Sequence, residues 1–112
     1  RKGTWRRVIA TENVTVQRGE MEPGVTFDGS VHRYPEDQMI IVLEGKMRIR
    51  IGDEEDWIEP GDVAVIPGNV FHGGVGVGSA GAEYIEIISG GRMDYLPGYV
   101  GPPKNEFKGP GE

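Results

Sequence analysis

The hydrophobic positions of this chain alternate with polar ones at a period of two along most of its length. Met47, Ile49 and Ile51 alternate with basic residues, and Val14 and Val16 alternate with polar ones in the same way. This period is that of a β-strand with one buried and one solvated face. The pattern predicts short strands near 13–18, 38–43, 46–52, 62–66 and 82–88.

Two apolar runs, 39–43 and 63–66, are continuous, which predicts strands buried on both faces. Turn sequences such as Pro60-Gly61-Asp62 and Pro67-Gly68-Asn69 separate the runs at regular spacing. No window of ten or more residues combines a helical period with freedom from Gly and Pro, so we expect at most a turn or two of helix. Eight to ten short strands with regular turns predict an all-β sandwich or barrel.

Two segments depart from this pattern. Residues 73–82 contain five glycines and a serine, which predicts a mobile loop beside His72 rather than a regular strand. Residues 97–112 are rich in Pro, Gly and charge, and we expect them to be extended or to lie over the barrel. The predicted organisation is therefore a barrel over residues 1–96 and a tail over residues 97–112.

Composition narrows the classes of function. The 112 residues suit one domain, and the net charge of −6 argues against a nucleic-acid partner. The absence of cysteine excludes thiolate metal sites and fits a cytoplasmic location. No apolar run approaches the roughly 20 residues of a membrane helix, so no membrane partner is expected. The missing initiator Met suggests a trimmed or partial chain.

The candidate chemistry centres on the only two histidines, His32 and His72. His32 and Tyr34 lie two apart in an extended segment, so their side chains leave by the same face. Gln38 opens the next strand, and His72 comes from a distant one. Imidazole nitrogens suit Zn, Fe, Ni and Cu, and an amide oxygen suits the harder metals. Two histidines and one oxygen donor on strands predict a metal site with positions left open for substrate.

These residues resemble the two motifs of the cupin superfamily. Gly24, His32, Gln38 and Gly45 match its first motif, in which Tyr34 takes the place of a second His. The second motif is matched by Gly61, Pro67 and His72. Five residues separate Gly61 from Pro67 and four separate Pro67 from His72, which is the family's spacing. The resemblance covers roughly residues 14–96. It implies a double-stranded β-helix, or jelly-roll barrel, of two facing antiparallel sheets.

The departures from the motifs point to one branch of the superfamily. Gln38 replaces the usual Glu, Gly76 replaces Asn, and Gly68 and Asn69 are transposed. Gln at the acid position is similar to the pectin-degradation cupins, which ring-open unsaturated uronates to linear keto sugars. The segment 89–96 also resembles their Ser-Pro-Pro-Arg-Glu-Asp-Phe ending. That likeness implies that Arg92 grips a substrate carboxylate with two hydrogen bonds.

Several residues keep alternative roles at this stage. The metal ligands expected are His32, Gln38, His72 and Tyr34, with Zn, Ni, Fe, Mn or Cu as the ion. Tyr34 is either a ligand or an acid/base group, and Gln38 is either a ligand or a hydrogen-bonding residue at a strand corner. Arg92 is either a substrate clamp or half of a surface ion pair. Tyr34 and Arg92 are the expected catalytic residues.

We expect a metal-dependent isomerase or lyase that acts on a small oxygenated acid, such as a sugar acid or keto acid. Neutral ligands leave a divalent ion nearly its full charge, which favours Lewis-acid chemistry. The alternatives are an iron- or copper-dependent oxygenase and a non-catalytic ligand-binding cupin. Small cupins typically pair, and the basic first strand offers a sheet edge, so a homodimer is expected.

Overall fold

The computed structural model describes residues 3–102 and 105–111, and nearly all of their regular structure is β-strand. The only helical element among the described residues is one turn of 3₁₀-helix, η1 (Met93–Tyr95). This confirms the prediction of an all-β chain. The strands, in chain order, are β1 (Thr4–Ala10), β2 (Val14–Met21), β3 (Val31–Arg33), β4 (Gln38–Ile51), β5 (Glu54–Ile58), β6 (Val63–Ile66), β7 (His72–Ser89) and β8 (Glu106–Lys108).

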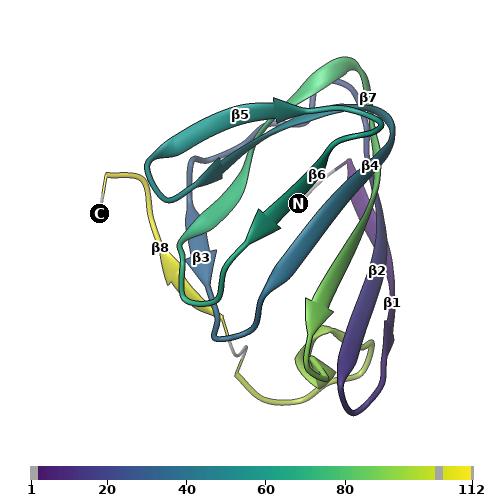
Figure 1. Ribbon diagram of the computed structural model, residues 1–112, viewed down its shortest axis with the longest axis vertical. Helices are drawn as coiled ribbons and strands as arrows, with labels where there is room; N and C mark the ends of the chain where they lie inside the picture. The colour runs from purple at the N-terminus through teal and green to yellow at the C-terminus, as the bar shows by residue number, and fades with distance from the viewer. Residues whose placement is uncertain (1–2, 103–104, 112) are drawn as a thin grey trace.

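All strand pairs are antiparallel, and they form one sheet that curls into a barrel (Figure 1). The order β1-β2-β7-β3-β8 makes one path, and β4 pairs with β5, β6 and β7. Because β7 pairs with β2 and β3 and also with β4, it joins the two halves of the barrel. The predicted jelly-roll barrel is confirmed.

The long strands β4 and β7 bend where they face one another. Gly45 and Gly81 both have positive φ, +71° and +77°, and a Cβ at Gly45 would overlap the carbonyl oxygen of Gly81. The pairing also shifts register between Val42 and Glu44, and between Gly45 and Met47. Such bends let one strand serve both halves of a barrel.

The prediction of a mobile loop over residues 73–82 is wrong, because this segment belongs to β7. Residues 73–77 pair with β4 from Met47 to Arg50. The glycines permit this pairing at close range: a Cβ at Gly78 would lie 2.8 Å from the Lys46 side chain, and one at Gly73 would lie 2.9 Å from the Ser30 carbonyl. Glycine here serves a close approach of neighbouring chains rather than mobility.

The prediction that the two continuous apolar runs are buried on both faces is also wrong. The core contains Ile40, Val42 and Ile66, whereas the alternate side chains face outward and include Met39 at 45% exposure and Val65 at 55%. A single barrel layer has only one inner face, so every second side chain of these strands lies outside.

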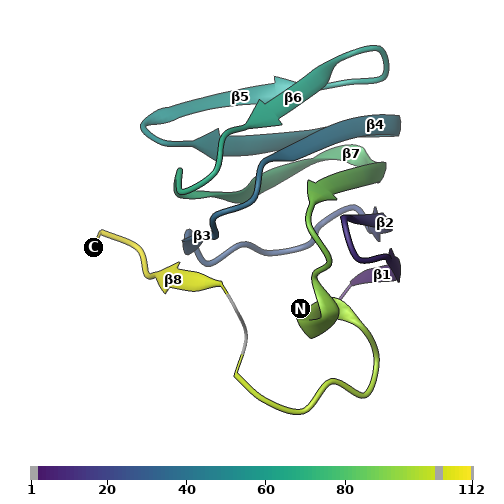
Figure 2. The ribbon, with the colours of Figure 1, turned by 60° about the horizontal axis from the view of Figure 1, so that its bottom comes forward.

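The C-terminal segment returns to the barrel. After η1 the chain crosses below the strands, and β8 then pairs with β3 along the register Val31–Lys108, His32–Phe107 and Arg33–Glu106 (Figure 2). The segment expected as a tail thus supplies a strand beside His32. Among the described residues, no helix is long and apolar enough to cross a membrane.

Candidate functional site

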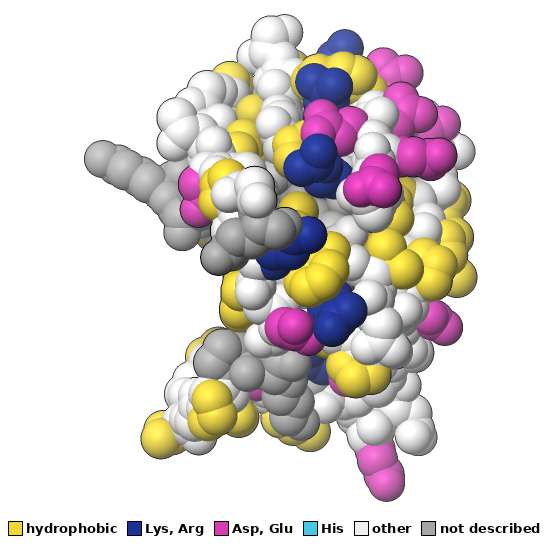
Figure 3. Space-filling model, turned by 90° about the vertical axis from the view of Figure 1, so that its left-hand side faces the viewer, with side chains coloured by type: hydrophobic (Ala, Val, Ile, Leu, Met, Phe, Trp, Pro, Cys, Tyr) yellow, Lys and Arg dark blue, Asp and Glu magenta, His cyan; other side chains and the backbone are white. Residues whose placement is uncertain are grey.

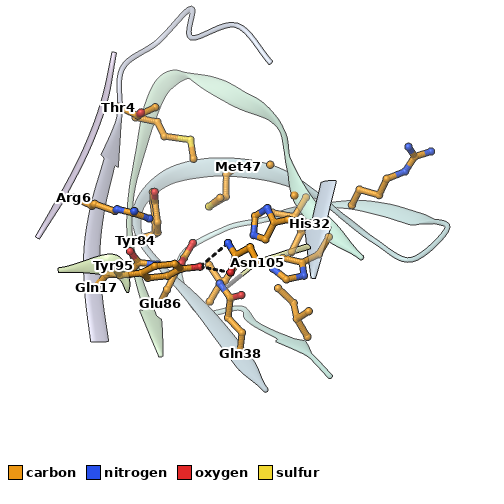
Figure 4. Close-up of a pocket in the computed structure, with 18 of the residues that line it drawn as sticks. Thr4, Arg6, Gln17, His32, Gln38, Met47, Tyr84, Glu86, Tyr95 and Asn105 are labelled. Atoms are coloured by element: carbon orange, nitrogen blue, oxygen red, sulfur yellow. Dashed lines mark hydrogen bonds between the residues drawn. The ribbon is translucent and has the colours of Figure 1, made fainter. Parts of the chain in front are cut away.

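A cavity of about 630 Å³ fills the interior of the barrel. His32 and Gln38 line one part of it, and Arg6, Gln17 and Glu86 line another (Figure 4). Apolar side chains of the core, such as Met47 and Ile49, form much of the remaining wall. A cavity of this size is typical of sites for small organic ligands.

The two histidines meet directly across the sheet. His32 in β3 pairs in register with His72 in β7, and their ring centroids are 4.6 Å apart. Burial, followed by the neighbouring His72, lowers the pKa of His32 to about 4, and burial lowers the pKa of His72. Both rings are therefore neutral near pH 7, which is the form that binds a metal ion.

His72 presents a buried lone pair to the cavity. Its Nδ1 lies 3.0 Å from the carbonyl oxygen of Val70 and donates to it, since a carbonyl oxygen only accepts. In the neutral ring the proton is then on Nδ1, and Nε2 carries the lone pair. Nε2 is buried and has no hydrogen-bond partner in the described part of the chain. An imidazole oriented by a backbone carbonyl is a common arrangement for metal-ligating histidines.

Tyr34 and Gln38 form a second pair beside the histidines. The Tyr34 hydroxyl donates to the Gln38 amide oxygen, and the Tyr34 ring centroid lies 5.5 Å from that of His72. Burial raises the pKa of Tyr34, so the phenol keeps its proton. The structure therefore brings together all four residues expected at the metal site, with Tyr34 acting as a donor to Gln38.

The imidazole nitrogens and neutral oxygens of these four residues are atoms that can coordinate a divalent metal ion. Within residues 3–102 and 105–111, no group of three His, Cys, Asp or Glu side chains could hold a metal. The neutral oxygens beside His32 and His72 include those of the Gln38 amide and the Tyr34 phenol, and the Asn105 amide also lines the cavity. The unpartnered Nε2 of His72 is the observation that favours occupation by an ion.

Arg92 is not placed to bind the carboxylate of a substrate in the cavity. Its side chain is fully buried and is absent from the cavity wall, and its Nε and Nη2 donate to Asp94 at 2.9 and 2.7 Å. The guanidinium is sandwiched between the rings of Tyr34 and Tyr95, at 4.3 and 4.4 Å. Its bidentate face is thus already occupied by a carboxylate of the protein. Arg92 also donates to Asn105, which ties the segment before β8 to the barrel.

Glu86 is a cavity residue that the sequence reasoning missed. It points inward from β7 on the same face as Tyr84 and Ile88, and its carboxylate accepts from Gln17 (Figure 4). Burial raises the pKa of Glu86 to about 7, although Gln17 and Arg6 oppose this shift. A carboxyl group with this pKa exchanges a proton near neutral pH. The available signal was a single charge within the apolar run Ile85-Glu86-Ile87-Ile88.

Several charged side chains around the barrel form ion pairs. Figure 3 shows a row of Lys and Arg side chains with Asp and Glu beside them on the side where β5 and β8 lie. Arg33 pairs with Glu106 of β8, and Arg48 and Arg50 both lie within 3.4 Å of the Glu55 carboxylate in β5. This face therefore carries mixed charge rather than a basic patch for a polyanion.

The comparisons with known proteins agree with this architecture. The family model of the cupin domain matches residues 14–88. No curated protein matches the chain. The solved structure of KdgF from Halomonas sp. has 25% sequence identity and a TM-score of 0.74, and the match covers 86% of each chain. This bears out the predicted resemblance to the pectin-degradation cupins.

Two further likenesses concern the fold alone. An RmlC-like cupin from Shewanella frigidimarina NCIMB 400 has 22% identity and a TM-score of 0.72 over 84% of this chain and 82% of that one. Oxalate decarboxylase from Bacillus subtilis has 21% identity and a TM-score of 0.68. The match covers 86% of this chain but only 27% of the decarboxylase, which is a much longer protein.

Proposed function

The chain belongs to the cupin domain family, and from that membership we propose that its cavity holds a divalent metal ion and acts on a small oxygenated acid as an isomerase or lyase. His32, His72 and Gln38 are the proposed ligands. The buried and unpartnered Nε2 of His72 is the observation that carries this proposal. A site built from two neutral imidazoles and an amide suits Zn, Ni, Fe, Mn or Cu.

The bound ion would polarise a carbonyl or hydroxyl of the substrate. The chain itself supplies the proton transfer, because Glu86 lies in the same cavity and its pKa of about 7 suits both taking up and releasing a proton. Gln17 holds the Glu86 carboxylate in place through its amide. Tyr34 has a positioning role in this scheme, since its hydroxyl fixes the orientation of Gln38.

Arg92 is also proposed as a positioning residue. Its guanidinium packs against the Tyr34 ring and, through Asp94 and Asn105, connects that ring to the C-terminal segment. This arrangement holds Tyr34 rigid, so that the phenol and the Gln38 amide stay aligned. A rigid supporting shell is what keeps a metal site in its productive geometry.

The test of the metal site is the metal content of purified protein before and after chelation and reloading with Zn²⁺, Ni²⁺ or Mn²⁺. We expect one ion per chain in the wild type, and a loss of most of it in His32→Ala and in His72→Ala. Gln38→Ala should bind the ion more weakly but still bind it, because water can occupy an oxygen position. Tyr34→Phe should keep the ion.

Three outcomes would change the assignment. A loss of metal in Tyr34→Phe would make Tyr34 a ligand. Unchanged metal content in both histidine variants would contradict the metal site and favour a non-catalytic ligand-binding cupin. A coloured iron or copper form that consumes oxygen would favour the oxygenase.

We further propose that the chain forms a homodimer through the outer face of the sheet. One cross-strand row on this face is apolar across five strands, from β6 through β4, β7 and β2 to β1. Its outer members are strongly exposed, with Ile9 at 72% and Val65 at 55%. A contiguous apolar surface of this kind marks an interaction site more often than isolated exposed residues do. The row consists of Val65, Met39, Ile87, Val16 and Ile9.

The charges at the ends of this face make it complementary to itself. Arg7 and Arg18 lie in the adjoining row at the end formed by β1 and β2, whereas Glu59 and Asp62 lie at the other end, next to β6. A two-fold axis along β7 would place the basic end of one copy over the acidic end of the other. A second copy of the chain is therefore the partner that this face fits.

A further inference from the structure

Arg6 differs from the other arginines near the cavity in its lack of a carboxylate partner. Arg50, which also lines the cavity, has Glu55 at 3.4 Å, and the guanidinium of Arg92 is held by Asp94. For Arg6 and its neighbour Arg7, no acidic group lies within 4 Å among the described residues. Arg6 is an exposed residue at the side of the cavity, and a guanidinium there that has no carboxylate partner is poised to receive an anion.

The strand geometry places these two neighbours on opposite faces. Arg6 lies in β1 opposite Gly19 of β2, and its side chain points into the cavity toward Tyr84 and Tyr95 (Figure 4). Its guanidinium carbon is 4.7 Å from the centroid of the Tyr95 ring. Because side chains alternate along a strand, Arg7 leaves by the outer face. Only one of the two cations therefore acts inside the cavity.

Arg6 is also electrostatically connected to the reacting groups. Its charge acts on both Glu86 and His32, which lie on different parts of the same wall. Because Arg6, Glu86 and both histidines line one cavity, a substrate held by Arg6 would have its remaining atoms within reach of Glu86 and of the histidine pair. The rings of Tyr84 and Tyr95 flank this space with flat apolar surfaces.

We infer that Arg6 is the anion-recognising residue of this cavity and receives the carboxylate of the substrate, whose reacting carbon then lies between Glu86 and the two histidines. This assignment rests on the proposed function and adds to it the residue that recognises the acid group of the substrate. The planar fork of a guanidinium matches the two oxygens of a carboxylate. The carboxylate-binding role that the family resemblance implied for Arg92, which precedes η1, is thereby assigned to Arg6 in β1.

The experiment compares binding of D-galacturonate and D-galactose, two probes with the same ring that differ by a carboxylate in place of a hydroxymethyl group. Calorimetric titration of the wild type should give at least tenfold tighter binding of galacturonate. Arg6→Gln should lose that preference by weakening galacturonate binding at least tenfold, with galactose binding unchanged. Arg6→Lys should retain part of it, since it keeps the charge and loses the fork. Arg7→Gln, the matched control on the outer face, should behave as the wild type.

The same titrations on His72→Ala separate this inference from the metal site. If the ion is absent but Arg6 has the inferred role, the preference for galacturonate persists in His72→Ala. Retention of the full preference in Arg6→Gln, with an unfolding midpoint equal to that of the wild type, would overturn the inference. A wild type that does not distinguish the two sugars would overturn it as well.

Discussion

At the scale of single residues, the cavity is organised by a few buried polar groups whose protonation the barrel interior controls. The histidine pair is neutral because desolvation disfavours the imidazolium form, and Glu86 is largely uncharged below neutral pH for the corresponding reason. Asn69 shows how a single residue can meet a conformational requirement of the backbone. It has φ of +66° at the motif position where the family has glycine, and asparagine is among the residues that adopt this conformation most readily.

Glu86 makes the stability of the fold dependent on pH. Its pKa rises from an ordinary value of 4.5 to about 7 on folding, so the folded state binds the proton more readily than the unfolded state. The resulting stabilisation is complete below pH 4.5 and is lost as the pH rises through 7. Relative to Glu86→Gln, the wild type should lose up to about 3 kcal/mol of unfolding free energy between about pH 5 and pH 8.

This dependence is measured by urea unfolding of chelated protein at several pH values. Glu83→Gln is the control, because Glu83 lies on the same strand and pairs with Arg18 at the surface. Its stability curve should run parallel to that of the wild type. A Glu86→Gln curve that also runs parallel would show that the carboxyl group is ionised in the folded state at all these pH values.

At the scale of elements, the bends of β4 and β7 decide whether two long strands can close the barrel. Each strand must turn where the other does, and at this point a Cβ on Gly45 would overlap the carbonyl oxygen of Gly81. Neither position has room for a side chain, and both need a left-handed backbone. The extended pairing of β7 beyond the bend in turn brings His72 opposite His32. The geometry of the candidate metal site thus depends on two glycines distant from it.

Gly45→Ala should therefore destabilise the fold by at least about 3 kcal/mol, through backbone strain together with overlap against the Gly81 carbonyl. Gly61→Ala is a matched control, since Gly61 has φ of +98° but open space around a Cβ. It should cost about 1–2 kcal/mol from backbone strain alone. Chemical unfolding of both variants measures the difference. Equal losses would show that the close approach of β4 and β7 contributes nothing to stability.

At the scale of the whole molecule, the barrel separates an interior cavity that holds the buried polar groups from an outer face that is apolar along one row across β6, β4, β7, β2 and β1. The same alternation of side chains that directs Gln38 and Ile40 inward directs Met39 and Ile41 outward. The strands β4 and β6 consequently read as continuous apolar runs. Their inner side chains build the core, and their outer side chains build the face proposed for dimerisation.

Light scattering should give a mass of twice the 12.2 kDa of the chain at micromolar concentration. Met39→Glu and Val16→Glu together should shift the protein to the monomer, because burial of four carboxylates in the symmetric interface is strongly unfavourable. Val100→Glu is the control, since Val100 is 94% exposed in the C-terminal segment, outside the apolar row. A monomeric wild type would contradict the proposed dimer, and a dimeric double variant would contradict this face as its interface.

The sequence by itself determined the class of the fold and the identity of the histidine pair. Strand periodicity and turn residues are local properties, and the motif spacing around His32 and His72 follows from the chain alone. The strand role of residues 73–82 was not predictable in this way, because a glycine-rich segment gains a regular backbone only from the partner strand beside it. The outward direction of Met39 and Val65 likewise depends on the sheet forming a single layer.

Only the tertiary structure decided which polar side chains share the cavity. Glu86, Arg6 and Asn105 are far apart in the sequence and belong to no motif, and their roles follow from where β7, β1 and the segment before β8 meet. Arg92 has a motif position, yet its guanidinium lies against the ring of Tyr34 and donates to Asn105, both distant in sequence, as well as to the nearby Asp94. Whether a charged side chain meets a ligand or another side chain is set by long-range packing, which a local pattern does not encode.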